Sequence, residues 1–415
     1  MSSPKAPDPS STPLTSDQRR LLIFLSAATF FEGFDFLAIT QVLPHVRADF
    51  GLSQSETGLL VGVANIGPIL ACFIVRLIDR IGRRKVMQYT LLGYAGFTLA
   101  SGLAPDPYSF AIAQLLARMF LVGEWATSMV YAAESFPAER RGQAIGIIQG
   151  VAALGAVTCG GVAPLLMKLE VGWRAVYFFG AIPVVILLFA RRNLKETERF
   201  LAVANAEQNR RALWDIVRGP HRLRVLTVAL LWWLVYVGTH NATTFWKEFA
   251  MTERGMTDGQ VGVSLTIAAV CAMPFVFAVG PMLDRLGRRG GAAIIYPVAA
   301  LGVLGAFTLT DRVGLTIAMA LTIFGASAVL PVVEAYTTEL FPTELRGDAF
   351  AWANNLLGRL GPVLSPPLVG IAAEHVGWGP AVATTSVANI LALILIWAAL
   401  PETRGRELED ISGSA

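Results

Sequence analysis

The chain alternates between long apolar runs and short polar segments, and this pattern predicts membrane-spanning helices. Leu21–Leu43, Gly58–Val75 and Val225–Val237 are typical apolar runs. A helix of about 20 apolar residues is long enough to cross the hydrocarbon core of a bilayer. Segments of this length number twelve, near residues 21–44, 56–76, 86–104, 108–133, 143–167, 175–192, 223–249, 259–283, 291–310, 313–339, 348–372 and 379–400. We therefore predict an all-α integral membrane protein with twelve transmembrane helices.

The polar segments divide the chain into five parts. We expect a disordered tail over residues 1–20, a six-helix bundle over 21–193, a linker over 194–222, a second six-helix bundle over 223–400 and a tail over 401–415. The linker is rich in Arg, Glu, Asn and Gln, which favours short amphipathic helices on the membrane surface.

Three motifs recur with one offset of 205 residues. Asp-Arg-Ile-Gly-Arg-Arg at 79–84 returns as Asp-Arg-Leu-Gly-Arg-Arg at 284–289. The segment 131–142, with Glu-Ser-Phe-Pro and a final Arg-Gly, has its counterpart at 336–347, and Gly172-Trp173 returns as Gly377-Trp378. Three motifs in one register indicate two equivalent halves, and in a membrane protein this is typical of a transporter with its site between the halves.

Composition agrees with a membrane protein and excludes several other classes. The chain is 54% apolar and 15% charged, against about 45–50% and about 25% in soluble domains. It has no Walker loop, nucleophile elbow, zinc-ligand run or glycine-rich dinucleotide turn, so we expect no enzyme, no ATP-driven pump, no cofactor and no metal site. The three cysteines lie far apart within predicted spans and suggest no disulfide.

The basic residues predict the orientation. With a cytoplasmic N-terminus, 25 of the 33 Lys and Arg lie on the cytoplasmic side, as the positive-inside rule requires. We therefore expect a multi-pass protein of the plasma or bacterial inner membrane, with both termini cytoplasmic. The basic residues are explained by topology, so we expect no nucleic-acid partner. A small-molecule substrate, protons and the lipid bilayer are the expected partners of a monomer.

The repeated Asp-Arg-x-Gly-Arg-Arg loops resemble the signature loop of the major facilitator superfamily. The family pattern has a glycine four residues before the Asp; Gly280 fits it, whereas the first copy has Val75, followed by Arg76. The twelve spans, the repeat and the central linker extend the resemblance over the whole chain. It implies two pseudo-symmetric six-helix bundles, the major facilitator fold, that work by alternating access.

Two further stretches narrow the resemblance within the superfamily. Glu32-Gly33-Phe34-Asp35 is similar to the Asp-Gly-aromatic-Asp motif of aromatic-acid/proton symporters, with Glu in place of the first Asp. The stretch from Arg118 to Gly142 is similar to the fourth span and following loop of metabolite/proton symporters.

Ionisable residues inside the spans are the candidates for function, because each costs about 2.5–3.5 kcal/mol at the bilayer centre. Asp35 and Glu32 share a helix face near the middle of the first span, and adjacent carboxylates can retain a proton between them. We expect Asp35, with Glu32, to couple protons. Arg118 and Arg359 lie at a similar depth in the two halves and could bind a substrate carboxylate. The alternative is an Asp35–Arg118 ion pair that takes no part in proton transfer.

Other candidates have weaker support. His240 is the repeat counterpart of Asp35, so it either lines the cavity or packs in the core; Asn241 is its neighbour. Glu124 and Glu334 lie within spans, where a pairing with a neighbouring helix competes with a substrate or proton role. Trp246, Lys247 and Glu248, at the outer end of the seventh span, are expected to anchor it at the membrane surface.

The repeated loops are expected to act as ion-pair latches on the cytoplasmic side, although topology alone explains many of their arginines. The latch residues are Asp79, Arg80, Gly82, Arg83, Arg84, Glu134 and Arg141 in the first half and Asp284, Arg285, Gly287, Arg288, Glu339 and Arg346 in the second.

The expected function is secondary active transport, in which a small organic anion is carried with protons. Proton-driven efflux of a drug-like or cationic compound is the alternative. The fifth span lacks the Gly-Pro and Gly-Gly sequence of family antiporters and has Gly160-Gly161-Val162-Ala163-Pro164 instead. Closely spaced glycines in that span, among them Gly146, Gly150 and Gly155, predict tight helix packing.

Overall fold

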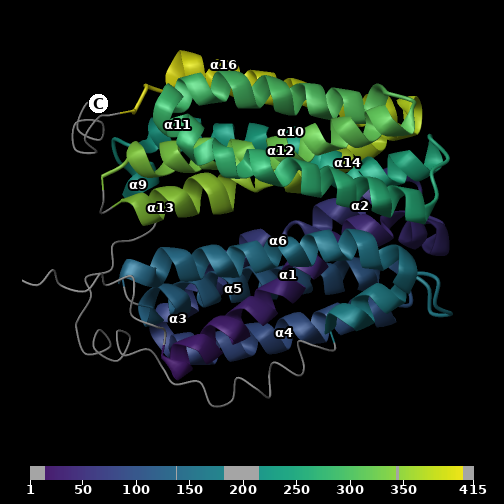
Figure 1. Cartoon of the computed structure of the whole chain (residues 1–415), viewed down its shortest axis with the longest axis horizontal. Helices are drawn as coiled ribbons and strands as arrows, with labels where there is room; N and C mark the ends of the chain where they lie inside the picture. Colours follow the sequence, from purple (N-terminus) through teal and green to yellow (C-terminus); the bar gives the residue numbers. More distant parts are fainter. Residues whose placement is uncertain (1–14, 137, 182–214, 343–344, 405–415) are drawn as a thin grey trace, which may run out of the picture.

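The computed structural model describes residues 15–136, 138–181, 215–342 and 345–404, and their regular structure is helical, as predicted (Figure 1). In chain order the helices are α1 Ser16–Phe50, α2 Gln54–Ala64, α3 Gly67–Ile81, α4 Arg83–Leu103, α5 Pro107–Ser135, α6 Ala138–Leu166, α9 Asp215–Arg218, α10 Arg222–Thr252, α11 Asp258–Thr308, α12 Arg312–Glu339, α13 Arg346–Phe350, the π-helix η3 Ala351–Gly358, α14 Leu360–Val376, α15 Trp378–Ala383 and α16 Ser386–Ala399.

The first helix begins inside the segment that was expected to be a disordered tail. Thr15 Oγ1 accepts the N–H of Gln18, and Gln18 Oε1 accepts the N–H of Thr15. This reciprocal capping box satisfies two N–H groups at the start of α1. The predicted tail is therefore too long at its C-terminal end, while residues 1–14 lie outside the described part of the chain.

Eight helical stretches in the described residues, some of them made of consecutive helices such as α2 and α3, are long and apolar enough to span a membrane. One of them, α11, contains two predicted spans and bends at Gly287, where φ is 81°. The third and fourth predicted spans correspond to α4 and α5, which are not among those eight. The sixth is helical up to residue 181, where the described segment ends. Residues 182–214 and 405–415 lie outside the described residues, and with them the end of the predicted first bundle, most of the predicted linker (194–222) and most of the predicted C-terminal tail (401–415).

The repeat of the sequence is also a repeat of backbone conformation. Gly82 and Gly287, 205 residues apart, have φ of 97° and 81°. Gly172 and Gly377, at the same offset, have φ of 60° and 83°. Positive φ strains a residue with a side chain but is open to glycine. Both halves therefore bend at the same places, and the glycines of the repeat are required by these bends.

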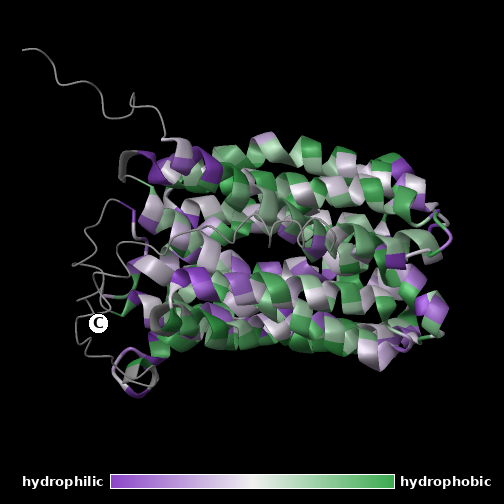
Figure 2. Ribbon diagram, turned by 90° about the horizontal axis from the view of Figure 1, so that it is seen from below, coloured by the Kyte–Doolittle hydropathy of each residue, from purple (hydrophilic) through white to green (hydrophobic). Residues whose placement is uncertain are grey.

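The two bundles lie side by side with their helices roughly parallel to one long direction (Figure 1). We call the end where α1 begins and α16 ends the terminal face, and the opposite end the distal face. Figure 2 shows hydrophobic residues along most of the length of the helices and hydrophilic residues concentrated toward their ends. This distribution is what a bilayer around the bundles requires.

Close glycine contacts bring the halves together toward the distal face. A Cβ on Gly58 of α2 would lie 2.3 Å from the carbonyl oxygen of Pro366 in α14, and one on Gly370 would lie 2.6 Å from the carbonyl oxygen of Gln54. Nearer the terminal face, a Cβ on Gly142 or on Gly280 would meet nothing within 4 Å. The close contacts between the halves at Gly58 and Gly370 thus lie toward the distal side, and neither Gly142 nor Gly280 makes a contact of this kind.

Within the first half, tight packing depends on fewer glycines than the sequence suggested. A Cβ on Gly155 of α6 would lie 1.9 Å from the carbonyl oxygen of Phe30, and one on Gly33 of α1 would lie 1.9 Å from that of Ala152. These two glycines allow α1 and α6 to touch. Gly146 and Gly150 have open space beside them, so the packing role expected for them is wrong.

Candidate functional site

Two irregular helix segments meet halfway between the faces. The second predicted span is broken between α2 and α3, and Asn65 stands at the break. The eleventh contains the π-helix η3, and Arg359 follows it directly. Such irregular segments are frequent at functional sites, because they free backbone groups and redirect side chains.

Arg118 is the central cation of the first half. It lies on α5 and is 6% exposed. Its Nη1 donates to Asn65 Oδ1 at 2.6 Å, and its guanidinium lies 5.5 Å from the ring centroid of Phe36. In the described residues no ion pair joins Arg118 to Asp35, although the two interact electrostatically. The simple ion-pair alternative is therefore not the arrangement present.

Arg359 is the corresponding cation of the second half. Its guanidinium lies 5.9 Å from the ring centroid of Tyr236, whose hydroxyl donates to Asn354 Oδ1 at 2.8 Å. Arg359 Nε is buried and has no hydrogen-bond partner among the described residues. Arg118 and Arg359 are close enough to interact electrostatically with each other and with His240. The two guanidinium groups thus converge from opposite halves.

The acidic pair lies on α1 beside this cationic centre. Asp35 is 7% exposed and Glu32 is 3% exposed. Thr98 Oγ1 donates to Asp35 Oδ2 at 3.0 Å, whereas Asp35 Oδ1 is buried without a hydrogen-bond partner in the described part. Both carboxylates interact electrostatically with Tyr94. A buried carboxylate with one unsatisfied oxygen is well suited to take up a proton.

Several predicted binding residues lie elsewhere. Glu124 is fully buried and accepts hydrogen bonds from Thr90 at 2.8 Å and Ser128 at 2.9 Å, between α4 and α5. Asn241 Nδ2 donates to Ser365 Oγ at 2.8 Å, a contact within the second half. These contacts place Glu124 and the Asn241 Nδ2 in helix packing, whereas Asn241 Oδ1 is buried without a hydrogen-bond partner among the described residues. His240, by contrast, lies at the centre, with Nε2 at 3.1 Å from Asn65 Nδ2.

The latch residues form two equivalent ion pairs at the terminal face. Arg83 pairs with Glu134 at 3.0 Å, and Arg288 pairs with Glu339, so that both members are offset by 205. Each pair joins helices of one half, α4 to α5 and α11 to α12. They brace each bundle separately in this conformation.

The remaining latch residues contribute less defined contacts. Asp284 and Arg285 are exposed, Arg84 and Arg141 are partly buried, and Arg346 Nε donates to the carbonyl of Phe341 at 3.2 Å. The side chains of Asp79 and Arg80 lie outside the described residues.

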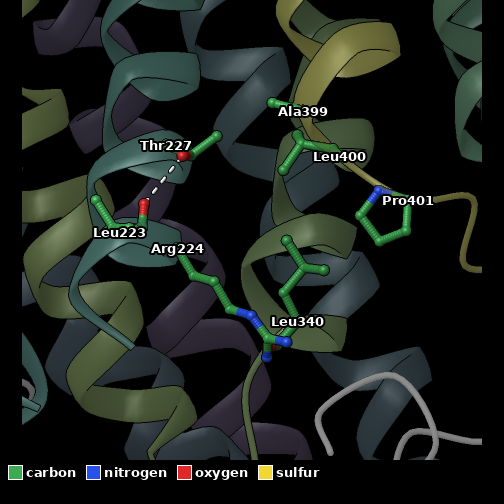
Figure 3. Close-up of a pocket in the computed structure, with 7 residues that line it drawn as sticks. All are labelled: Leu223, Arg224, Thr227, Leu340, Ala399, Leu400 and Pro401. Carbon is green, nitrogen blue, oxygen red and sulfur yellow. Dashed lines mark hydrogen bonds between the residues drawn. The ribbon is translucent and has the colours of Figure 1, made fainter. Parts of the chain in front are cut away.

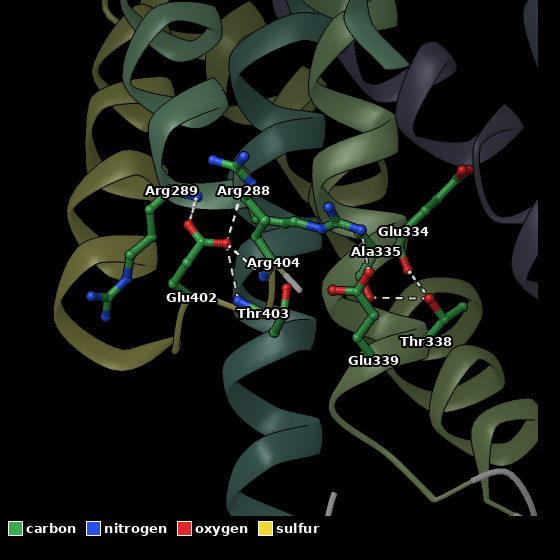
Figure 4. Close-up of polar contacts among 9 residues, drawn as sticks. All are labelled: Arg288, Arg289, Glu334, Ala335, Thr338, Glu339, Glu402, Thr403 and Arg404. Atoms are coloured by element: carbon green, nitrogen blue, oxygen red, sulfur yellow. Dashed lines mark hydrogen bonds and ion pairs between the residues drawn. The ribbon is translucent and has the colours of Figure 1, made fainter. Parts of the chain in front are cut away.

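Glu402, which is not among the predicted latch residues, stabilises the second of the two repeated loops. Glu402 accepts the backbone N–H groups of Arg288 and Arg289, each at 2.9 Å, where α11 resumes after Gly287 (Figure 4). Burial raises the pKa of Glu402, but hydrogen bonds from four backbone N–H groups outweigh it and hold the pKa below its usual value. Glu196-Thr197 precedes Glu402-Thr403 by 206 residues, and this near-repeat could have identified the motif.

A cavity of about 300 Å³ at the terminal face lies away from this centre. Its lining belongs to the second half, and Arg224 Nη1 donates to the carbonyl of Leu340 at its edge (Figure 3). None of the charged residues at the centre (Arg118, Arg359, Asp35 and Glu32) lines this cavity, so we do not assign it to the candidate site.

Five charged or titratable side chains meet near the distal face; we call them the distal charge cluster. Arg47 Nη1 of α1 lies 2.7 Å from Glu248 Oε1 of α10. Asp258 of α11 lies 3.0 Å from His45 Nε2 of α1 and 2.6 Å from Lys247 Nζ of α10. The side chains of Lys247 and Glu248 are 1% exposed. The expectation that they anchor the helix at the membrane surface is wrong, because they pair inside the protein and link its halves.

Comparison with known proteins gives the family. The Major Facilitator Superfamily model matches residues 25–249 and 234–414. The chain is 26% identical to the probable 4-methylmuconolactone transporter of Cupriavidus pinatubonensis, with 92% of this chain and 90% of that protein covered. It is 23% identical to the sialic acid transporter NanX of Escherichia coli, with 91% and 93% covered.

A solved structure has the same fold. The crystal structure of a D-xylose-proton symporter matches with a TM-score of 0.77 and 20% identity, covering 94% of this chain and 99% of that one. The predicted fold, two six-helix bundles, is confirmed. Since the family model matches both halves, this protein belongs to the major facilitator superfamily and is a membrane transporter, not an enzyme.

Proposed function

We propose that this protein carries a small organic anion across the membrane together with protons, by alternating access of its two halves. The observation that carries the proposal is the convergence of Arg118 and Arg359, one from each half, next to the buried carboxylate of Asp35. A site shared by both halves is the place where binding can be linked to their relative movement.

The two guanidinium groups favour an anionic substrate. Each presents planar N–H donors that match a carboxylate, and such charge-assisted bonds are stronger than neutral ones. Arg359 has a buried Nε without a partner in the described residues, so a substrate oxygen there would satisfy it. The cargoes named for the two relatives, 4-methylmuconolactone and sialic acid, both carry a carboxylate, which agrees with this chemistry.

Asp35 is the proposed proton carrier, with Glu32 beside it. A proton on Asp35 would give the unsatisfied oxygen a donor and remove a buried charge. The positive charge of Arg118 favours the ionised form of Asp35. A substrate carboxylate that engages Arg118 would weaken this attraction and favour protonation of Asp35, which couples the two events.

We place the terminal face in the cytoplasm, on the ground of the distribution of basic residues. With this orientation, the proposal is that the distal charge cluster closes the outer side and that the cytoplasmic side opens. The protein would act as a monomer in the plasma or bacterial inner membrane, and the paired loops would stabilise the cytoplasmic ends of the bundles as they move.

Uptake into proteoliposomes tests the proposal. Radiolabelled sialic acid and 4-methylmuconolactone are offered under an imposed pH gradient, acidic outside, with D-xylose as an uncharged control. Accumulation of either carboxylate above its external concentration, lost when a protonophore collapses the gradient, supports symport. Proton-driven expulsion from loaded vesicles would support the efflux alternative, and uptake of D-xylose alone would contradict an anion site.

A further inference from the structure

The side chain of Asn65 joins a charged group of one half to two groups of the other. It is 3% exposed and stands at the break between α2 and α3. Its Oδ1 accepts from Arg118 Nη1 at 2.6 Å, while its Nδ2 donates to the carbonyl of Pro362 at 2.8 Å and lies 3.1 Å from His240 Nε2. Arg118 has only donors, so the oxygen must face it and the amide nitrogen must face the second half.

The second half offers Asn65 a carbonyl that its own helix cannot use. In a regular α-helix the carbonyl of Pro362 would accept the N–H of residue 366, but this is Pro366, which has none. A buried carbonyl without a donor is costly. Asn65 supplies that donor from the other half, so its contact with Pro362 satisfies α14 as well as joining the bundles.

The geometry also fixes Asn65 relative to Arg118. A Cβ on Gly67, at the start of α3, would lie 2.2 Å from the carbonyl oxygen of Leu115 and 3.2 Å from Arg118 Cβ. The backbone after Asn65 is therefore pressed against α5 at the level of Arg118. Small movements of the Arg118 side chain must be accommodated by the Asn65 amide, because the backbone has no room.

We propose that Asn65 is a positioning residue that transmits occupation of Arg118 to the contact between the halves. This inference rests on the proposed function. A substrate carboxylate competes with the neutral Asn65 oxygen for the guanidinium and, as a charged acceptor, forms the stronger bond. Asn65 Oδ1 then loses its donor, the amide turns, and the bonds to Pro362 and His240 weaken. Substrate binding thus weakens the contact that Asn65 makes between the two bundles at the level of Arg118.

Two substitutions separate this role from a structural one. Asn65→Ala removes both ends of the bridge and leaves Arg118 available to substrate. Asn65→Asp keeps an acceptor for Arg118, now charged, but loses the donor to Pro362. Asn389→Ala is the matched control, since Asn389 is a buried amide that donates to the carbonyl of Gly238 within the second half.

The experiment combines binding with distance measurement by electron paramagnetic resonance. Spin labels at Gly142 and Gly280, where a side chain meets open space, report opening at the terminal face. Sialic acid and 4-methylmuconolactone are the probes. We expect probe to change the distances in wild type and in Asn389→Ala. In Asn65→Ala the probe should bind within about threefold of wild type while the distance change is lost, and Asn65→Asp should bind at least tenfold more weakly.

Three outcomes would overturn the inference. A distance change that persists in Asn65→Ala shows that Asn65 does not transmit occupation. If a folded Asn65→Ala no longer binds the probe, Asn65 is a direct ligand of the substrate and not a positioning residue. If neither probe binds to the wild type, the proposed function fails, and the ligand-free distances decide the role of Asn65. They should broaden in Asn65→Ala but not in Asn389→Ala, and equal distributions refute the bridge between the halves.

Discussion

The ion pair between Arg47 and Glu248 should determine how firmly the distal face is closed. The pair spans 2.7 Å between α1 and α10, and Glu248 is 1% exposed while Arg47 is 26% exposed. Opening of the distal face separates α1 from α10 and exposes both charges to water. Arg47→Gln leaves the buried Glu248 without its direct ion-pair partner only in the closed state, and therefore destabilises that state selectively.

The size of the effect follows from burial. Removing one member of a buried pair costs about 3–5 kcal/mol. Water reaches Arg47, so we take a smaller cost of about 2–3 kcal/mol. With a factor of ten for each 1.4 kcal/mol, this changes the equilibrium between closed and open distal faces by roughly 30- to 150-fold.

Spin labels at Glu170 and Gly259, both exposed near the distal face and in different halves, measure this equilibrium. Arg174→Gln is the control, because Arg174 pairs with Asp49 at 2.9 Å within the first half. We expect a long-distance population to grow in Arg47→Gln and to remain at the wild-type level in Arg174→Gln. Equal populations in Arg47→Gln and wild type would refute the assignment of this pair as an outer gate.

Four further results are expected. Asp35→Asn should abolish accumulation against a gradient but retain counterflow exchange, as measured in proteoliposomes; intact accumulation contradicts its proton role. Arg359→Ala should raise the Kd for a carboxylate about 10- to 100-fold, since a bond to a charged group is lost, and titration of purified protein checks this. The pKa of Glu402 is lower in the folded than in the unfolded protein, so this carboxylate stabilises the fold above the unfolded-state pKa, and that stability is lost as the pH falls through the folded-state pKa. The thermal unfolding temperature of the wild type should therefore fall more on acidification than that of Glu402→Gln. Parallel pH profiles of the two proteins would contradict this role of Glu402. Gly58→Leu should force the distal face apart, because even a Cβ there would lie 2.3 Å from a backbone oxygen. Distal spin labels should then report longer distances than in the wild type. Unchanged distances would show that α2 and α14 accommodate the side chain without separating.

The architecture was predictable because it depends on patterns that the sequence repeats. Apolar runs predicted the helices, and the 205-residue offset marked the two loops in which the structure shows the glycine bends and the ion pairs. The bends at Gly82 and Gly287 and the pairing within each half were not predicted. The charges Arg118 and Asp35 could be selected because a buried charge within a span needs a reason.

The partners of these charges could not be predicted, because they come from distant parts of the chain. Asn65 is an ordinary polar residue in the sequence, and its contact with Pro362 spans 297 positions. Lys247 and Glu248 stand at a helix end, where surface anchoring is the usual explanation. Only the approach of α1 and α11 shows that they are enclosed. For Glu124 the sequence left a substrate or proton role and a pairing with a neighbouring helix open, and the structure shows hydrogen bonds from Thr90 and Ser128.

In the proposed mechanism an organic anion and protons move together through one site between the halves. The most direct measurement records luminal pH in proteoliposomes when a carboxylate substrate is added outside, without an imposed gradient and with the membrane potential clamped. Symport should acidify the lumen as substrate enters, and Asp35→Asn should show no acidification although substrate still exchanges. Substrate entry in wild type without acidification, or with alkalinisation, would contradict proton-coupled symport.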